Sequence, residues 1–515
     1  MVLDKLLHVS LREAWLIIFA LCLLYLCRNR FHHGLNKYPG PFLASVTDWW
    51  RFFDVWSRRP DITHAKLHRR YGDIVRLGPN YLSFASPAAL KDIYGLKSGT
   101  MKSEFYPVQQ AVANGKRLPS LFSTTDESFH ASLRRAVSNA FSLSTLLQYE
   151  PLVDSTTSEF LKQLQLRFAD REGSEGNFDF ARWLQYYAFD VIGELTYSKR
   201  HGFIDEGRDI DGIIQYLAGL FDYVAPIGQI PFLDVLWLKN PILGYLGQWG
   251  IIDRTFPVAK FAISRMEERA NAESKEASSP NGPLDLLSKF QEASKKHPEI
   301  MTPSRVLTMA VSMAFAGSET TAISLSAVFY YLLKNPRCYH KLIEELDVAH
   351  SNGMLGTDDV VPVAAAQKMV YLDACIKEAF RLHPAAGIPL ERITPAAGLN
   401  IAGEYIPGGT IVGCSAWIIH QRAEVFGDDV DTYRPERWIE NTETKLKEMN
   451  GTMFQFGMGA RTCIGKNISL LEIYKVVPSI LRKFQIEFAD SDTNWTLRNS
   501  WFVRQLGFRV RIKKR

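Results

Sequence analysis

The most continuous apolar segment of the chain lies near its N-terminus. Residues 14–27 read AWLIIFALCLLYLC without a charged side chain, and a basic cluster follows from Arg28 to His33. The run is shorter than the roughly 20 residues that a bilayer core prefers, but apolar neighbours and snorkelling arginines can lengthen it. A cleaved signal peptide is the alternative, yet no small-residue cleavage site follows and the basic cluster lies on the wrong side. We predict a single-pass membrane anchor over residues 1–33, with the rest of the chain in the cytosol.

Beyond the anchor, the first patterned segments are a hinge and a hairpin. The sequence YPGPF from residue 38 to 42 is typical of a stiff connection, and we place a hinge with this Pro-Gly-Pro over residues 34–60. Residues 73–86 alternate between apolar and polar side chains and turn at Gly78 and Pro79. This alternation predicts a short β-hairpin.

The rest of the pattern is rich in helices. Helical periodicity dominates roughly residues 87–350. Residues 399–417 are short strand-like segments separated by glycine turns. The pattern predicts a mainly α fold with small segregated β-sheets (α+β). Because no low-complexity tract, repeat or long linker divides residues 61–515, we expect them to form a single domain.

The longest predicted helix follows Thr302 and Pro303, an N-cap and a first-turn proline, and ends before Pro336. It is long enough to span a membrane, but glycine, serine and threonine residues interrupt its apolar character repeatedly. We therefore predict a buried central helix of a soluble core. Glu319 is the only charged side chain between residues 306 and 333. A buried carboxylate costs several kcal/mol unless something compensates it or uses it.

Composition narrows the classes of protein. The 515 residues carry a formal net charge of +5, and 46% of them are hydrophobic, which suits a globular protein. The positive charge is too diffuse for nucleic-acid recognition and is compatible with an anionic membrane surface or an acidic protein partner. The six cysteines have no zinc-ligand spacing, and such a sparse set is typical of reduced thiols in the cytosol.

One cysteine has an informative setting. Residues 454–477 read FQFGMGARTCIGKNISLLEIYKVV, in which Cys463 comes just before a predicted amphipathic helix that begins near Gly465. A helix N-terminus favours thiolate over thiol, which suits a nucleophile or a soft metal ligand. A buried structural cysteine is the alternative. A nucleophile would need a base, for which His420 is the only nearby histidine in the sequence.

This region resembles the haem-binding signature of the cytochrome P-450 family, microsomal type, in the spacing Phe456-x-x-Gly459-x-Arg461-x-Cys463-x-Gly465. The resemblance covers nearly the whole chain and implies a haem-binding catalytic domain with haem b. It implies that Cys463 is the axial thiolate ligand of the iron, whose electron donation favours O–O cleavage. Phe456 would shield the sulfur, while Gly465 and the backbone N–H groups after Cys463 would complete the cofactor loop.

Two further segments match the family in its order along the chain. The helix KEAFRLHP carries Glu378 and Arg381 three residues apart, and YRPERW carries Arg437. The resemblance implies that these three charges satisfy one another in the core, as a structural scaffold behind the haem. An exposed i, i+3 salt bridge would be the ordinary interpretation of Glu378 and Arg381 alone. Tyr433 and Trp438 stand where the family usually has phenylalanine.

The segment AGSETT, residues 316–321, is similar to the oxygen-activation segment in the family's long central helix over the haem. The resemblance implies that Gly317 leaves room for dioxygen and that Thr320 hydrogen-bonds the oxygen being activated. Glu319 would relay protons inward from solvent. The alternative for this acid–alcohol pair is a polar patch that contacts another helix.

The haem propionates also need cationic partners. The resemblance implies four of them: His130, Arg134, Arg392 and Arg461. His130 and Arg134 lie one turn apart on a predicted helix, and the family often has tryptophan at the position of His130. A solvated surface charge is the ordinary alternative for each of the four.

The resemblance also implies a reaction class and partners. We expect a monooxygenase of the endoplasmic reticulum membrane that uses O2 to hydroxylate, epoxidise or oxidatively demethylate a lipophilic small molecule. No dinucleotide-binding fingerprint is present, so electrons must come from a partner. We expect the NADPH-dependent cytochrome P-450 reductase, with cytochrome b5 as a second donor. A basic docking face for the partner has four candidates: Arg135, Lys466, Lys475 and Arg482.

The substrate is the least determined part of the interpretation. The segments KSEFYPVQ and TCIGKNISLLEIYKVVP look most like fungal enzymes of the pisatin-demethylase type. This resemblance suggests a secondary metabolite such as a terpenoid, polyketide, alkaloid or flavonoid. Three other functions stay open: a haem-thiolate isomerase or dehydratase that does not use O2, detoxification of a plant aromatic compound, and a non-enzymatic haem- or lipid-binding protein. Residues 220–238 are apolar and aromatic, and either dip into the membrane or belong to the core.

Overall fold

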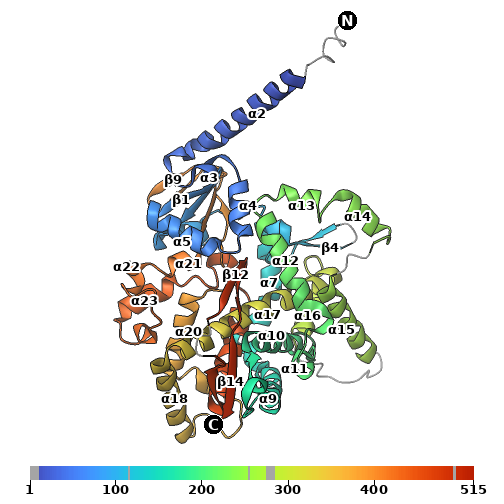
Figure 1. Ribbon diagram of the computed structural model, residues 1–515. Helices are drawn as coiled ribbons and strands as arrows, with labels where there is room; N and C mark the ends of the chain where they lie inside the picture. Colours follow the sequence, from blue (N-terminus) through green and yellow to red (C-terminus); the bar gives the residue numbers. More distant parts are fainter. Residues whose placement is uncertain (1–10, 114–115, 253–255, 274–284, 491–493) are drawn as a thin grey trace.

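The computed structural model describes residues 11–113, 116–252, 256–273, 285–490 and 494–515. Helix α2 (Leu11–Phe31) extends away from the folded body, at the top of Figure 1. Among the described residues, two helical segments are long and apolar enough to cross a membrane: Glu13–Lys37, which includes most of α2, and α17 (Pro303–Lys334). None of the apolar window of the first is buried, against 61% of the window in α17. The prediction of a buried core helix after Pro303 is therefore confirmed.

The chain enters the body through its Pro-Gly-Pro segment. The backbone N–H of Arg76 donates to the carbonyl oxygen of Pro39 at 2.8 Å. A Cβ on Gly40 would lie 2.2 Å from the carbonyl oxygen of Arg76, so only glycine fits here against strand β1 (Ile74–Gly78). Two short helices follow within the predicted hinge and contact the same strand, α3 (Phe42–Val46) and α4 (Trp49–Trp56).

The largest sheet has the strand order β1, β2 (Tyr81–Phe84), β10 (Ile411–Cys414), β7 (Arg392–Ile393) and β3 (Met101–Lys102). Strands β1 and β2 pair antiparallel, which confirms the predicted hairpin. Strand β10 runs parallel to β2 and antiparallel to β7. Strand β7 pairs antiparallel with β3, and this register puts Arg392 directly opposite Lys102.

The other sheets of the described chain are small and separate. Their pairings are β4 (Ala111–Ala113) with β5 (Lys116–Leu118), β8 (Leu399–Ile401) with β9 (Glu404–Ile406), and β12 (Thr496–Ser500) with β13 (Phe502–Leu506). A three-stranded sheet has the order β11 (Phe484–Phe488), β14 (Arg509–Lys514) and β6 (Phe178–Asp179). The strands predicted within residues 399–417 are confirmed as β8, β9 and β10.

Helix α17 runs through the middle of the helical body (Figure 1). Thr302 precedes it in extended conformation, Pro303 lies in its first turn and Asn335 ends it. Its buried residues join one hydrophobic core with those of α9 (Glu150–Arg167), α10 (Phe180–Tyr197), α20 (Val370–Leu382) and α24 (Lys466–Lys483). The core therefore surrounds the helix that carries Glu319.

Shorter helices surround this core. In chain order they are α5 (Pro60–Tyr71), α6 (Pro87–Tyr94), α7 (Glu127–Val137), α8 (Leu143–Gln148), α11 (Phe203–Glu206), α12 (Ile213–Ile227), α13 (Phe232–Leu236), α14 (Pro241–Gln248), α15 (Pro257–Glu273), α16 (Leu286–Lys296), α18 (Pro336–Ser351), α19 (Val363–Ala366), α21 (Ala416–Ile419), α22 (Ala423–Phe426) and α23 (Glu443–Thr452). The 3-10 turns are η1 (His32–Lys37), η2 (Tyr106–Gln109), η3 (Ser138–Phe141), η4 (Gly173–Gly176), η5 (Ile210–Gly212), η6 (Pro435–Trp438) and η7 (Gly459–Arg461). The fold is thus helix-rich with small segregated sheets, as predicted.

Candidate functional site

Cys463 lies in a loop between two helical elements. Turn η7 ends at Arg461, and α24 begins at Lys466 with Gly465 as its N-cap. The backbone N–H of Cys463 donates to the carbonyl oxygen of Phe456 at 2.8 Å, which folds the loop back on itself. The sulfur accepts hydrogen bonds from the backbone N–H groups of Gly465 and Lys466. The predicted setting of a cysteine just before a helix is confirmed.

The thiol of Cys463 faces a hollow with protein walls. Its side chain is accessible to solvent, yet protein atoms surround it closely enough that burial raises the pKa of the thiol. The two N–H donors and the charge of Arg134 oppose that rise in pKa because they favour the thiolate. An accessible sulfur in such a hollow is placed to bind a group that fills it.

Gly459 and Phe456 fix the loop that carries Cys463. Gly459 has φ +68°, and a Cβ on it would lie 1.9 Å from the carbonyl oxygen of Tyr94 at the end of α6. Any other residue would be strained at this φ and would collide with that carbonyl. The ring of Phe456 meets that of Phe380 on α20 edge-on, with 5.5 Å between centroids. The loop is therefore held between α6 and α20.

Helix α17 is connected to the Cys463 region through α24. The hydroxyl of Thr321 donates to that of Ser469 on α24 at 3.1 Å. Ala316 is exposed and Thr320 is half-buried, although most of their helical neighbours are buried. The hydroxyl of Thr320 donates to the carbonyl oxygen of Ala316 at 2.7 Å. Helix α17 therefore has an exposed side near its midpoint, although most of the helix is buried in the core.

The structure corrects the expected role of Gly317. Its missing side chain was expected to leave room for dioxygen, but a Cβ on Gly317 would lie 3.0 Å from Cδ1 of Ile192 on α10. The glycine therefore allows close packing of α17 against α10. Ala316, one residue earlier, is the small residue on the exposed side.

Glu319 is buried without a hydrogen bond. It is 1% exposed, and neither carboxylate oxygen has a hydrogen-bond partner among the described residues. The nearest cation is Arg504 on β13, whose Nε lies 3.4 Å from Oε1 of Glu319. Burial raises the pKa of Glu319, Asp222 adds to the rise, and Arg504 and Arg182 oppose it. The carboxyl group therefore holds its proton more strongly than it would in water.

Cationic side chains from separate segments gather near the Cys463 loop. Burial lowers the pKa of His130 to about 3, and the nearby charges contribute in the order Arg461, Lys102, Arg134 and Arg392. Burial also lowers the pKa of Lys102 well below the ordinary lysine value, with further contributions from Arg392 and Arg461. Like charges directly opposite each other on paired strands, as at Lys102 and Arg392, repel. The cluster therefore has unbalanced positive charge.

Two arginines of this cluster also bind the protein itself. Arg461 pairs with Glu127 at the start of α7, with 2.7 Å between Nη2 and Oε1. Arg134 donates from Nη1 to the carbonyl oxygen of Thr462 at 2.9 Å. Arg461 is thus partly neutralised, whereas Arg134 ties α7 to the residue next to Cys463.

Glu378, Arg381 and Arg437 meet in the core. Arg381 donates to both carboxylate oxygens of Glu378, at 3.0 and 2.8 Å. Arg437 donates to Oε1 of the same glutamate at 2.8 Å, and Trp438 donates to Oε2 at 2.9 Å. The three charged side chains are completely buried. The surface interpretation of the Glu378–Arg381 pair is therefore excluded.

The residues present fit a haem. A macrocycle with one axial ligand and two propionates needs an accessible soft donor, a flat hollow and an excess of cations. Cys463 offers the donor, α17 has an exposed side at Ala316 and Thr320, and the cluster around His130 carries unbalanced positive charge. Each requirement is met by side chains that the fold brings from distant parts of the sequence.

Some site residues were not found from the sequence. Lys102 was missed because its opposition to Arg392 depends on the register of β3 and β7. Arg504 was missed because its contact with Glu319 joins the C-terminal hairpin to α17. Lys102 opens the segment KSEFYPVQ and Arg504 lies within the largely apolar WFVRQ, and by family analogy both segments were expected to cover the haem. The local pattern did not single out the cation in either one. Ala316 lay inside the AGSETT segment, but the sequence did not reveal which of its small residues is exposed.

One expected docking residue is wrong. Lys475 is 1% exposed and pairs with Glu150 at 2.5 Å and Asp154 at 2.6 Å. It therefore cannot contribute to a basic surface for a redox partner. Arg135 and Lys466 are exposed, so they remain candidates.

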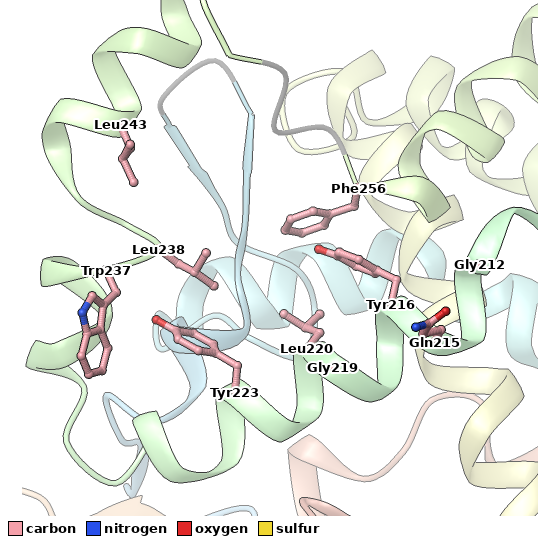
Figure 2. Close-up of a pocket in the computed structure, with 10 residues that line it drawn as sticks. All are labelled: Gly212, Gln215, Tyr216, Gly219, Leu220, Tyr223, Trp237, Leu238, Leu243 and Phe256. Carbon is pink, nitrogen blue, oxygen red and sulfur yellow. The ribbon is translucent and has the colours of Figure 1, made fainter.

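A separate apolar pocket of about 780 Å³ lies along α12. Figure 2 shows side chains projecting toward it from α12 and from the segments that follow α12, and the full lining is Gly212, Gln215, Tyr216, Gly219, Leu220, Tyr223, Trp237, Leu238, Leu243 and Phe256. Its walls are mostly apolar and aromatic. None of the site residues expected from the sequence lines it, so the pocket is distinct from the Cys463 hollow.

Comparison with known proteins agrees with this geometry. The sequence matches the Cytochrome P450 family over residues 45–509. It is 42% identical over 461 residues to a cytochrome P450 monooxygenase of Aspergillus terreus, an alignment that covers 89% of this chain and 91% of that protein. It is 40% identical over 499 residues to the cytochrome P450 monooxygenase cicH of Emericella nidulans, covering 97% of this chain and 98% of that protein.

A longer relative is the cytochrome P450 monooxygenase mpaDE of Penicillium brevicompactum, 35% identical over 512 residues that make up 98% of this chain and 58% of that protein. These similarities settle the class. The chain belongs to the cytochrome P450 family and is a haem b-dependent monooxygenase, an oxidoreductase that needs O2, a substrate and a redox partner.

Proposed function

We propose that Cys463 is the axial thiolate ligand of the haem iron, in an enzyme that oxidises a lipophilic secondary metabolite of a fungus. The observation that supports the ligand most strongly is the accessible sulfur in a protein-walled hollow, with backbone N–H donors from Gly465 and Lys466. Such donors tune how strongly a thiolate donates to a metal. The haem, when bound, supplies the activation of O2, while the chain supplies binding, orientation and protons.

The cation cluster is proposed to bind the two propionates. His130, Arg134, Arg392 and Arg461 come from α7, β7 and the Cys463 loop, and Lys102 of β3 joins them. Two carboxylates would compensate the charge repulsion between Lys102 and Arg392 and supply acceptors for charge-assisted hydrogen bonds. Because Arg461 already pairs with Glu127, we assign it the weakest contact.

Two residues of α17 are proposed to manage oxygen and protons. Thr320, on the exposed side of the helix, would hydrogen-bond oxygen during its activation. Glu319, buried and without a hydrogen bond, would donate protons toward the site and regain them from solvent. Gly317 supports both by allowing α17 to pack closely on α10.

The remaining site residues are proposed to hold the haem-binding domain in shape. Phe456 would shield the sulfur from water, and Gly465 is the N-cap from which α24 begins beside Cys463. A Cβ on Gly465 would make only an ordinary contact of 4.0 Å with Sγ of Cys463. Glu378, Arg381 and Arg437 form the scaffold that supports this loop from behind. We assign the domain to residues 61–515, with an anchor over 1–33 and a hinge over 34–60.

We propose that the enzyme is anchored in the endoplasmic reticulum membrane through α2. Apolar side chains on the 232–251 segment support a second contact with lipid, since several are more than half exposed: Phe232, Leu236, Trp237, Ile242, Tyr245, Trp249 and Ile251. Tryptophan and tyrosine are typical of membrane interfaces. The pocket along α12 lies beside this segment and would accept a lipophile that arrives from the bilayer.

Deletion of residues 1–33 should weaken sedimentation with microsomes; unchanged sedimentation in high salt would contradict the anchor.

Electrons are proposed to come from the NADPH-dependent cytochrome P-450 reductase, with cytochrome b5 as a second donor. The exposed cations Arg135 and Lys466 flank the Cys463 side of the molecule and suit an acidic partner. The resemblance of the segment KSEFYPVQ to fungal enzymes of the pisatin-demethylase type supports a terpenoid, polyketide or alkaloid as substrate. Hydroxylation, epoxidation and oxidative demethylation are the reactions considered.

The function is tested with the metabolite that accumulates when this enzyme alone is removed from its host. Microsomes containing the enzyme and reductase should convert that metabolite only when both NADPH and O2 are supplied. Omission of the reductase, of NADPH or of O2 should each stop product formation. Full turnover without them would instead indicate an isomerase or dehydratase and would contradict the proposal.

A further inference from the structure

The carboxyl group of Glu319 has one close cation, and that cation is shared. Arg504 of β13 approaches Oε1 of Glu319 with its Nε, at 3.4 Å. The same guanidinium donates from Nη2 to Oδ1 of Asp222 on α12 at 3.3 Å. Arg504 therefore stands between two carboxylates on two different helices.

Asp222 already has other partners of its own. Arg498 donates to it from Nη2 at 2.7 Å, and the hydroxyl of Ser500 donates at 2.6 Å. Arg58 approaches with Nη1 at 4.0 Å, and this buried nitrogen has no hydrogen-bond partner within the described chain. Burial would raise the pKa of Asp222, but its bonds to Arg498 and Ser500 and the charge of Arg58 lower it overall. One carboxylate thus faces three guanidinium groups.

This excess of positive charge leaves Arg504 free to act on Glu319. Arg498 and Arg504 are direct cross-strand partners on the β12–β13 hairpin, so they repel each other. Asp222 cannot neutralise both of them and Arg58 as well. Glu319 is the second carboxylate in reach, and it has no hydrogen bond that would compete for its charge.

The geometry points to Arg504 as a positioning residue that sets the acidity and orientation of Glu319, with Asp222 acting against it. The charged groups that face Glu319 are Arg504 from β13, Arg182 from α10 and Asp222 from α12. This inference rests on the proposed role of Glu319 as a proton relay. It adds that the relay is adjusted by a hairpin and by the helix α12, neither of which carries a residue of the expected catalytic pair.

The same contact connects the relay with α12. Phe221, next to Asp222, packs edge-on against Phe502 of the hairpin with 4.9 Å between ring centroids. The aromatic pair and the Asp222–Arg504 pair therefore join the same two elements. A shift of α12 on the hairpin would change the distance from Arg504 to Asp222 and thereby the charge available to Glu319.

The two substitutions that test this idea have opposite signs. Replacing Arg504 by methionine removes a positive charge beside Glu319, so the carboxyl group should keep its proton to higher pH. Replacing Asp222 by asparagine removes a negative charge and releases Arg504, so the group should lose its proton at lower pH. Each shift should be about one pH unit, as for a single charge within about 4–6 Å. A purely structural role for the ion pairs predicts no opposite shifts.

The experiment is an infrared pH titration of the carboxylic acid C=O band in the resting full-length holoenzyme. The band of Glu319 is assigned as the one that disappears in Glu319→Gln. Its midpoint should move up in Arg504→Met, down in Asp222→Asn, and return near wild type in Arg504→Lys. Arg498→Met is the matched comparison, because it removes the shorter ion pair to Asp222 without touching Glu319. It leaves Asp222 freer to neutralise Arg504, so its midpoint should move up, but by less than in Arg504→Met.

Coupling of NADPH use to product formation provides the second readout. Its pH dependence should shift in the same directions in Arg504→Met and Asp222→Asn, and these shifts should vanish when Glu319→Gln is added. Equal midpoints in all variants, or the same shift in Arg498→Met as in Arg504→Met, would overturn the inference. If Arg504→Met does not fold, the inference is tested by Asp222→Asn alone, in which the titration midpoint of Glu319 should move down. Normal coupling in Glu319→Gln would instead disprove the proposed relay, whatever the infrared midpoints.

Discussion

Arg437 donates a hydrogen bond from Nε to Oε1 of Glu378 at 2.8 Å, across 59 residues of sequence, with both side chains completely buried. Arg381, Trp438 and the backbone N–H of Arg434 also donate to this carboxylate. Two buried arginines and one glutamate would be costly alone, but here every charge has several partners, including Asp429 for Arg437 at 2.9 Å. The cluster joins α20 to turn η6.

Glu378→Gln should therefore destabilise the fold strongly. The substitution keeps the shape of the side chain but leaves two buried guanidinium groups without their carboxylate, which costs about 3–5 kcal/mol. Urea unfolding followed by tryptophan fluorescence measures the change in free energy. Lys377→Met is the control, since its 2.7 Å pair with Asp373 is one-third exposed and should contribute less than about 1 kcal/mol. Similar small losses of unfolding free energy in both variants would show that Glu378 does not stabilise the two buried arginines.

Thr320→Ala should separate oxygen use from product formation. The haem should still bind, because Thr320 is not among its proposed ligands, but activated oxygen should escape as hydrogen peroxide. The measurement is the ratio of peroxide to product per NADPH consumed, and Thr320→Ser should restore the wild-type ratio. Ser312→Ala removes a similar hydroxyl from the same helix, one that donates to the carbonyl oxygen of Thr308 at 2.7 Å, and should not alter coupling. Normal coupling in Thr320→Ala would disprove its role.

Lys102→Met should weaken retention of the haem. Loss of one charge-assisted contact, about 1.5–3 kcal/mol, corresponds to roughly tenfold or faster transfer of haem to an excess of an acceptor apoprotein. Lys91→Met, at an exposed lysine of α6, is the matched control and should transfer haem at the wild-type rate. Equal rates for the two variants would remove Lys102 from the propionate site.

Lys102 should also make the retention of haem depend on pH. Burial, Arg392 and Arg461 lower the pKa of Lys102 well below the ordinary lysine value. Since only the charged amine attracts a propionate, retention should be full at low pH and should fall as pH rises, before an ordinary lysine would titrate. The alkaline increase in the rate of haem transfer should be absent in Lys102→Met. An increase that persists in this variant would assign the titration to another group.

Features that depend on neighbouring residues were predictable from the sequence. The helix start after Thr302 with Pro303 in the first turn, the hairpin turn at Gly78 and the cysteine before α24 are all local, because helix start and turn conformation depend on a few adjacent residues. The side chain of Thr302 itself makes no capping hydrogen bond. The motif around Cys463 was also predictable, since its spacing lies within ten residues.

Features that depend on register and side-chain direction were not predictable. Gly317 faces Ile192, not the hollow, because a helix turns by about 100° per residue and one position changes the face. Lys475 lies between apolar residues of α24 and is buried against two carboxylates of α9. The contacts of Lys102 and Arg504 involve residues far away in the sequence. Lys102 lies opposite Arg392 on a paired strand, and Arg504 approaches Glu319 on α17.

The most direct test concerns Cys463 and the reduced, carbonyl-bound spectrum of the purified enzyme. A thiolate ligand shifts the Soret band of that complex to longer wavelength. The red-shifted band should be present in wild type and in Cys27→Ser, a substitution at another accessible free cysteine, and absent in Cys463→Ala. A red-shifted band that survives in Cys463→Ala would show that another atom holds the iron.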